Sequence, residues 1–210
     1  MLSIITLMLF ASCGQKGNHA QTTSNASVDT LEAVSLRDKT VKFLWRDSSA
    51  SMLINEAFAK KISAPEKAAL AYVATFIGNE CSWDGAYTED RSNLKCDILT
   101  ALNLGYQCSD SHLGFLRKWF SQDSAVLKDL EACPTTPNSA TIQDTFDEIV
   151  LTTKGNEIAV FFKATGINLR EEKSWSWSET DYFVVEHDMI KLIKKDKSKA
   201  TMGKVYAGPE

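Results

Sequence analysis

The chain carries two kinds of hydrophobic pattern, one after the other. Between residues 49 and 133, apolar side chains recur at the three- and four-residue spacing of a helix face. Between residues 145 and 193, β-branched and aromatic residues form short runs that are separated by turn-forming residues. Helices followed by an antiparallel meander of about four strands predict an α+β protein, in which the helices pack on one face of the sheet.

The helical pattern divides at residues that favour helix ends. Apolar residues at the start of this pattern share one helix face: Met52, Leu53, Phe58 and Ile62. The sequence Ser63-Ala64-Pro65-Glu66 is a capping box with an early proline, and it predicts a strongly apolar helix that ends near Gly78. Later caps predict three more helices, which begin after Ser92, after Ser109 or Asp110, and at Ser124.

The second pattern predicts the meander. Thr145–Thr153 and Glu157–Ala164 flank the turn Lys154-Gly155-Asn156, so this pair is expected to form a β-hairpin. In Trp175-Ser176-Trp177-Ser178, the alternation places both tryptophans on one face of a strand. The apolar residues Tyr182–Val185 continue this strand, and His187-Asp188 forms the hairpin turn before the last expected strand, Met189–Ile193.

Five cysteines divide into one near the N-terminus and four in the middle of the chain, namely Cys81, Cys96, Cys108 and Cys133. An even number of cysteines in an exported domain predicts two disulfides, for which three connectivities exist. We favour Cys81–Cys96 with Cys108–Cys133, because this pairing closes consecutive local loops. Zinc is the competing interpretation, but the cysteines lack its usual spacing and no histidine cluster is near. Neither a metal nor another cofactor is therefore predicted.

The N-terminus carries a signal for export. Residues 2–10 form a short apolar run, and a membrane-spanning helix would need roughly 20 apolar residues. The stretch Phe10-Ala11-Ser12-Cys13 resembles the lipobox of bacterial lipoproteins, in which the cysteine is diacylated and becomes the new N-terminus. The resemblance implies cleavage before Cys13 and a lipid anchor on it. Phe10 replaces the usual leucine and no basic residue precedes the run, so an ordinary cleaved signal is the alternative.

These features divide the chain into a signal peptide (1–12), a polar flexible tether (13–30), a helical region (31–134) and the meander (140–200). The last two regions can form one domain. The tether reaches on the order of 20 Å by random-coil scaling. The lipobox resemblance implies the bacterial cell envelope. Gly14 after the cysteine matches sorting to the outer membrane of a Gram-negative host, with the domain in the periplasm.

The charge pattern limits the partners. The formal net charge of −4 gives no basic footprint for nucleic acid. The lysines between Lys191 and Lys199 are typical of an edge strand, on which charged side chains prevent pairing with another protein, rather than of a binding patch. The expected partners are the membrane, reached through the lipid, and an envelope protein or glycan.

One stretch suggests catalysis. Glu80-Cys81-Ser82-Trp83-Asp84 stands at the end of the predicted apolar helix and resembles the catalytic helix end of lytic transglycosylases. The resemblance implies that Glu80 is the general acid that protonates the glycosidic oxygen, with Asp84 or Asp90 as a second carboxylate. The Gly-Leu-Met-Gln-like segment that follows in that family is absent, and Cys81 replaces its usual serine.

Trp175 and Trp177 are the other candidate site. Two tryptophans on one strand face can stack against sugar rings or anchor a protein partner. The alternative, which we favour, is that they cover the core under the helices. His112 and His187 lack partners at a triad spacing, and the acidic loop around Asp90 lacks the oxygen pattern of a calcium loop.

The sequence therefore favours a membrane-anchored, non-enzymatic binding module. The first alternative is a peptidoglycan-active enzyme that uses Glu80, which predicts a deep cleft with a second carboxylate about 5–9 Å away. The second is a periplasmic inhibitor or immunity protein, which predicts a protruding loop or a large exposed apolar patch. A shallow aromatic groove would favour the binding module.

Overall fold

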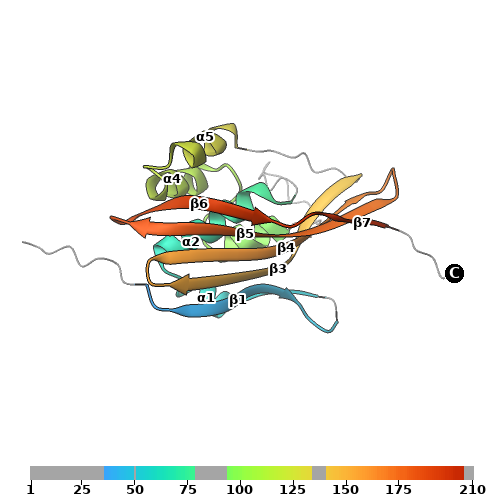
Figure 1. Cartoon of the computed structure of the whole chain (residues 1–210), viewed down its shortest axis with the longest axis horizontal. Helices are drawn as coiled ribbons and strands as arrows, with labels where there is room; N and C mark the ends of the chain where they lie inside the picture. The colour runs from blue at the N-terminus through green and yellow to red at the C-terminus, as the bar shows by residue number, and fades with distance from the viewer. Residues whose placement is uncertain (1–35, 50, 79–93, 134–140, 206–210) are drawn as a thin grey trace, which may run out of the picture. The chain divides into compact units, whose positions relative to one another are not determined.

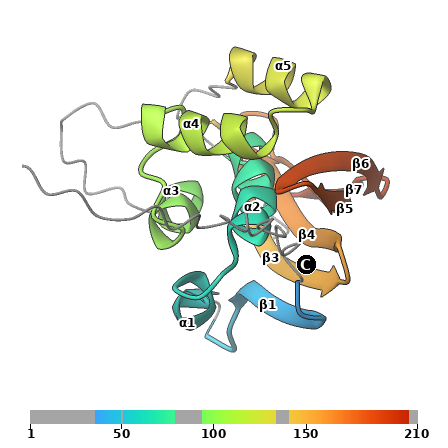
Figure 2. The same ribbon diagram turned by 90° about the vertical axis from the view of Figure 1, so that its left-hand side faces the viewer.

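The helices lie on one face of an antiparallel sheet, as Figures 1 and 2 show. The computed structural model describes residues 36–49, 51–78, 94–133 and 141–205. In these residues the strand order is β2-β1-β3-β4-β5-β6, and β7 pairs with the beginning of β5. The predicted combination of helices with an antiparallel sheet is confirmed.

The helix bounds follow the sequence signals. Helix α2 (Ala64–Phe76) begins after Ser63 and contains the capping box. The Ser109 side chain caps α4 (Asp110–Trp119), while Ser92, the predicted cap of the preceding helix, lies outside the described residues. The other helices are α1 (Glu56–Ala59), α3 (Leu94–Ala101) and α5 (Ser124–Ala132). All residues of α2 from Ala68 to Thr75 are buried, so this helix forms the centre of the core.

The strands confirm the two expected hairpins. They are β1 (Lys39–Arg46), β2 (Met52–Ile54), β3 (Ile142–Lys154), β4 (Glu157–Asn168), β5 (Lys173–Glu186), β6 (Met189–Lys197) and β7 (Thr201–Lys204). The β3–β4 pairing begins at Lys154 and Glu157, beside the predicted turn. The β5–β6 pairing begins at Glu186 and Met189.

Three strands correct the sequence interpretation. The expected meander of four strands is part of a seven-stranded sheet, which also contains β1 and β2, from the region predicted to be helical, and β7, which follows the predicted meander. Met52 and Leu53, assigned to a helix face, belong to β2, which pairs with β1. A short apolar run does not distinguish a strand from a helix. The strand that supports β1 is β3, which follows only after all five described helices.

Aromatic side chains join α2 to the sheet. The ring of Tyr72 lies 5.3 Å from that of Phe120 and 5.9 Å from that of Phe183, measured between centroids. Phe183 belongs to β5 and Phe120 directly follows α4, so three elements meet at Tyr72. Such tilted and edge-on pairs add to the stabilisation from buried area.

One predicted disulfide is present. Cys108 and Cys133 are bonded, with their Cα atoms 6.0 Å apart, and they join the loop before α4 to the end of α5. Cys81 lies outside the described residues, so the Cys81–Cys96 pairing stays a prediction, as do lipidation at Cys13 and the tether. Within the described part of the chain, no helix is long and apolar enough to cross a membrane.

Candidate binding site around strand β5

Strand β5 carries polar side chains on both faces of the sheet. From Trp175 to Val185, side chains with odd numbers face the helices and those with even numbers face away, as the burial pattern shows. The helix-facing side holds what we call the inner cluster: Trp177, Glu179 and Asp181 of β5 with Lys195 and Lys197 of β6. The opposite side holds a hollow. Both are candidate sites.

The structure places both predicted tryptophans on the helix-facing side of β5. Trp177 packs against the core, and its indole Nε1 is buried without a hydrogen-bond partner. The ammonium of Lys197 lies 5.0 Å from the centre of its ring. Trp175 lies against Gly166 of β4, where an added Cβ would overlap both the indole and the Asp144 carboxylate. A glycine at this position is therefore required for Trp175 to approach the sheet.

Two carboxylates of the inner cluster lie beside two lysines. The distance from Asp181 Oδ2 to Lys195 Nζ is 3.5 Å, and that from Glu179 Oε2 to Lys197 Nζ is also 3.5 Å. Asp181 is 2% exposed, and its Oδ1 is buried without a hydrogen-bond partner. Burial raises the pKa of Asp181 to about 7, Lys195 opposes this, and the nearby charge of Glu179 adds to it.

Asp144 of β3 extends this polar region along the same sheet face. Its Oδ1 is also buried without a hydrogen-bond partner. Burial raises the pKa of this carboxyl, while the charges of Lys197 and Lys95 act in the opposite direction. Three buried polar atoms without partners, on Asp144, Trp177 and Asp181, therefore share the helix-facing side of the sheet.

The hollow on the opposite side has a volume of about 260 Å³ and lies between β4, β5 and the segment that leads into β7. Its polar lining residues are the hydroxyl-bearing Ser176, Ser178, Ser198 and Thr201, the lysines Lys163 and Lys199, and the acidic Asp147, while Ala164 and Trp177 complete the lining. Hydroxyl groups both donate and accept hydrogen bonds, whereas an ammonium only donates them. The hollow therefore suits a small ligand that is rich in oxygen atoms.

Existing interactions already engage part of this lining. Lys163 pairs with Glu148 at 2.8 Å. The Ser198 hydroxyl accepts a hydrogen bond of 2.9 Å from the Ser178 amide, which connects β5 to the segment after β6. Asp147, at the edge of the hollow, is held by Arg46 at 3.0 Å and by the Thr165 hydroxyl. The floor of the hollow is thus ordered before a ligand arrives.

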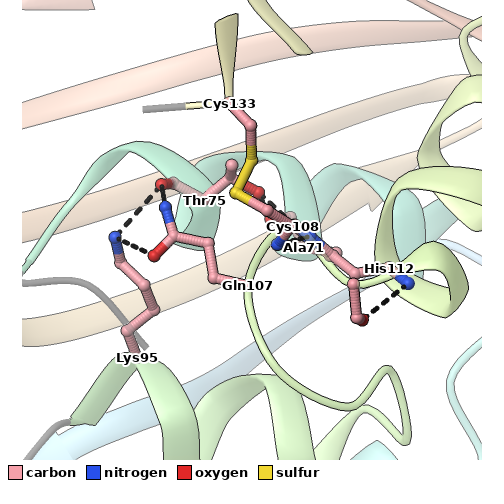
Figure 3. Close-up of a disulfide and its surroundings, with 8 residues drawn as sticks. Ala71, Thr75, Lys95, Gln107, Cys108, His112 and Cys133 are labelled. Atoms are coloured by element: carbon pink, nitrogen blue, oxygen red, sulfur yellow. Dashed lines mark hydrogen bonds between the residues drawn. A yellow bond between two sulfur atoms is a disulfide. The ribbon is translucent and has the colours of Figure 1, made fainter. Parts of the chain in front are cut away.

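A different buried polar network lies beside the disulfide, among the helices (Figure 3). His112 Nδ1 accepts a hydrogen bond from the Cys108 amide at 3.1 Å, so the ring proton is on Nε2, which lies 3.1 Å from Thr75 Oγ1. That hydroxyl in turn donates to the Ala71 carbonyl at 2.7 Å. Burial, assisted by Lys95, lowers the pKa of His112 to about 4. The histidine is neutral with both ring nitrogens engaged, which disfavours a role as a catalytic base.

Lys95 completes this network. Its ammonium donates to the Thr75 carbonyl at 3.1 Å and to Gln107 Oε1 at 3.2 Å, and Gln107 donates to the same carbonyl at 3.2 Å. Figure 3 shows the bonds from Lys95 and Gln107 meeting at the Thr75 carbonyl, near the end of α2. The network joins α2 to α3 and to the loop that carries Cys108, which indicates a structural role.

The catalytic candidates cannot be placed in this arrangement. Glu80, Asp84 and Asp90 all lie outside the described residues. His187 stands in the turn between β5 and β6, with a positive φ of 48°. Among the residues that the structure describes, no group of three or more histidine, cysteine or acidic side chains is arranged to hold a metal ion.

Sequence reasoning missed Glu179 and Asp181. The alternation that placed Trp175 and Trp177 on one face continues along β5 and places both carboxylates on that same face. This alternation is the signal in the sequence that indicates their position. Lys195 and Lys197 fit the lysine pattern of an edge strand, but that pattern does not predict their pairing with β5.

Comparison with known proteins identifies no relative of this chain. No family model matches it, and no curated protein or solved structure is significantly similar to it.

Proposed function

We propose that this protein is an envelope lipoprotein, anchored through lipid on Cys13, and that it acts as a non-enzymatic binding module. Its ligand site is the hollow beside β5, which holds one sugar residue of an envelope glycan. The observation that carries this proposal is the set of hydroxyl and ammonium groups that line the hollow. Sugars present hydroxyl groups, and acidic sugars present carboxylates, which these side chains complement.

The size of the hollow supports a small occupant. Sites for drug-sized ligands usually measure about 300–1,000 Å³. At about 260 Å³, the hollow suits a single ring that belongs to a longer chain, with the rest of the glycan outside it. The membrane anchor would then keep the module beside a polymeric ligand.

Surface composition favours this reading over the inhibitor alternative. The large apolar side chains that are exposed in the described residues are Leu53, Tyr106, Ile142, Leu169, Ile193 and Met202. They belong to six different strands and loops. An inhibitor that plugs a hydrolase would be expected to present its exposed apolar side chains on one continuous face.

Soluble peptidoglycan fragments test the proposed site. Addition of a disaccharide–peptide fragment to the isotopically labelled domain should shift the backbone NMR signals of Ser176, Ser178 and Lys199. Ser178→Leu fills the hollow and should abolish these shifts. Thr180→Leu, the next outward position on β5, does not line the hollow and should leave binding unchanged. Equal binding by both variants, or no binding by the wild type, would contradict the proposal.

Two further measurements address the anchor and the absence of catalysis. Mass spectrometry of the membrane-extracted protein should find a diacylated Cys13 at the mature N-terminus, and an unmodified Cys13 would exclude the lipid anchor. Incubation with intact peptidoglycan should release no fragments. If the wild type releases peptidoglycan fragments and Glu80→Gln does not, the protein is a glycosidase rather than a binding module.

A further inference from the structure

Glu179 and Asp181 form a buried pair of carboxyl groups. They are two residues apart on the same face of β5, so their side chains are neighbours. Their side chains are 10% and 3% exposed, respectively. Burial penalises the charge on Asp181, and the negative charge of Glu179 nearby adds to that penalty.

The groups around the pair leave one carboxylate oxygen without a donor. Lys195 and Lys197 face it from β6, each 3.5 Å from the nearer oxygen, and their side chains are 37% and 57% exposed. From α2, the Tyr72 hydroxyl is directed to Asp129 of α5, at 3.4 Å. The more distant charges on this side are Asp123, at the beginning of α5, and Asp144 of β3. None of these groups donates a hydrogen bond to Asp181 Oδ1.

A proton on Asp181 Oδ1 allows this oxygen to form a hydrogen bond as a donor. The protonated oxygen becomes a donor, and the carboxylate of Glu179, two residues away on the same face of β5, is able to accept from it. We propose that Glu179 and Asp181 hold one proton between them at neutral pH, and that release of this proton as the pH rises weakens the packing of α2 on the sheet.

The route from the carboxyl pair to α2 runs through Lys195. Its ammonium lies 4.9 Å from the ring centre of Tyr72 and 5.6 Å from that of Phe76, both on α2. When Asp181 is neutral, Lys195 is free to remain over these rings. An ionised Asp181 attracts the ammonium towards itself, and it also places a second negative charge beside Glu179. The raised pKa of Asp181 agrees with this account.

Carboxyl NMR titration of the wild-type protein is the direct test. One carboxyl carbon should titrate near neutral pH, far above the ordinary range of about 4. That signal should vanish in Asp181→Asn, whose amide imitates the protonated acid. In Glu179→Gln the midpoint should fall, because the neighbouring negative charge is gone. If every carboxyl group of the wild type titrates below about pH 5, a donor such as water satisfies Oδ1 and the proposal is overturned.

Thermal unfolding tests the consequence for packing. A group whose pKa is higher in the folded protein contributes stability at low pH and loses it as the pH rises through the folded pKa. Between about pH 5 and pH 8, the Tm of the wild type should fall by roughly 5–10 °C relative to Asp181→Asn. Asp196→Asn removes an exposed carboxylate from the other face of β6 and should follow the wild type. Parallel curves for the wild type and Asp181→Asn would contradict the link to packing.

Discussion

Two buried carboxylates of this protein behave in opposite ways. Glu66, at the beginning of α2, is 0% exposed, and Asp181, on β5, is 2% exposed. Burial acts to raise the pKa of both groups. The pKa of Glu66 is nevertheless lowered, whereas that of Asp181 rises to about 7. Burial alone therefore does not decide the charge of a buried acid.

The difference lies in the number of donors. Glu66 Oε2 accepts from the Ser63 hydroxyl at 2.6 Å and from the Ser63 amide at 3.2 Å. Its Oε1 accepts from the Thr153 hydroxyl at 2.6 Å, and Lys39 reaches both oxygens, at 2.9 and 3.0 Å. Asp181 has one lysine at 3.5 Å from Oδ2 and no donor at Oδ1. Donors on both oxygens stabilise the ionised form of Glu66.

The largest expected effect is the loss of the Glu66 charge. Glu66→Gln leaves Lys39 without its counter-charge and disturbs the capping box, so it should reduce the free energy of unfolding by about 3 kcal/mol. Because the pKa of Glu66 is lowered, this contribution is present above its ordinary pKa and is lost in acid. Urea unfolding at neutral pH measures the difference.

Glu56→Gln is the matched control. Glu56 is also in the first turn of a helix, but its side chain is 74% exposed and lies 3.7 Å from Lys60. Its loss should cost less than about 0.5 kcal/mol. Equal losses in the two variants would show that the donors around Glu66 contribute little.

His112 should make the protein sensitive to acid, opposite in direction to Asp181. Its pKa of about 4 in the folded protein is below the ordinary value of 6.5, so its stabilisation is present above pH 6.5 and is lost towards pH 4. The loss should reach about 2–3 kcal/mol in urea unfolding. His112→Gln should flatten this dependence, and the exposed turn histidine variant His187→Gln should retain it. If the free energy of unfolding of His112→Gln depends on pH as it does in the wild type, another group causes the acid sensitivity.

Lys195 should set the midpoint at which Asp181 loses its proton. The charge of Lys195 lowers the pKa of Asp181, so Lys195→Met should raise the midpoint by about one pH unit in the carboxyl NMR titration. Lys194→Met is the control, because Lys194 pairs with Asp196 and lies over the Tyr182 ring. A midpoint that does not move would mean that Lys195 is too hydrated to act on Asp181.

The smallest expected effect concerns Trp177. Trp177→Phe removes a buried N–H that has no partner, which offsets the loss of apolar contact, so the change should stay below about 1 kcal/mol. Thr75→Val removes a fully bonded hydroxyl and should cost about 2 kcal/mol in the same urea experiment. A larger loss in Trp177→Phe than in Thr75→Val would reveal a bound partner at the indole.

Features with local causes were predicted from the sequence. The capping box of α2, the Ser109 cap of α4 and the hairpin turns depend on residues within a few positions of each other. The disulfide between Cys108 and Cys133 was expected because it closes a local loop, and it is present. In each case the partners are near in the chain, so the residue types alone indicate the structure.

Features with distant causes were not predicted. Strand β1 depends on pairing with β3, and β2 depends on β1, so the apolar residues of β2 resembled a helix face. Within the candidate site, the alternation located Trp175 and Trp177 on one face. It did not show that Gly166 of β4 makes room for Trp175, or that the opposite face of β5 borders a hollow.

The sequence identifies Glu66 as part of a helix cap. It neither located Asp181, which the folded protein holds on the helix-facing side of β5, nor indicated the charge of either group. The further donors of Glu66 are Lys39 and Thr153, which are 27 and 87 residues away along the chain. The charge of Asp181 depends on β6 in the same way, because β6 supplies Lys195 beside Oδ2 but no donor for Oδ1. The ionisation of a buried acid is set by the groups that folding places around it, whatever their distance in the sequence.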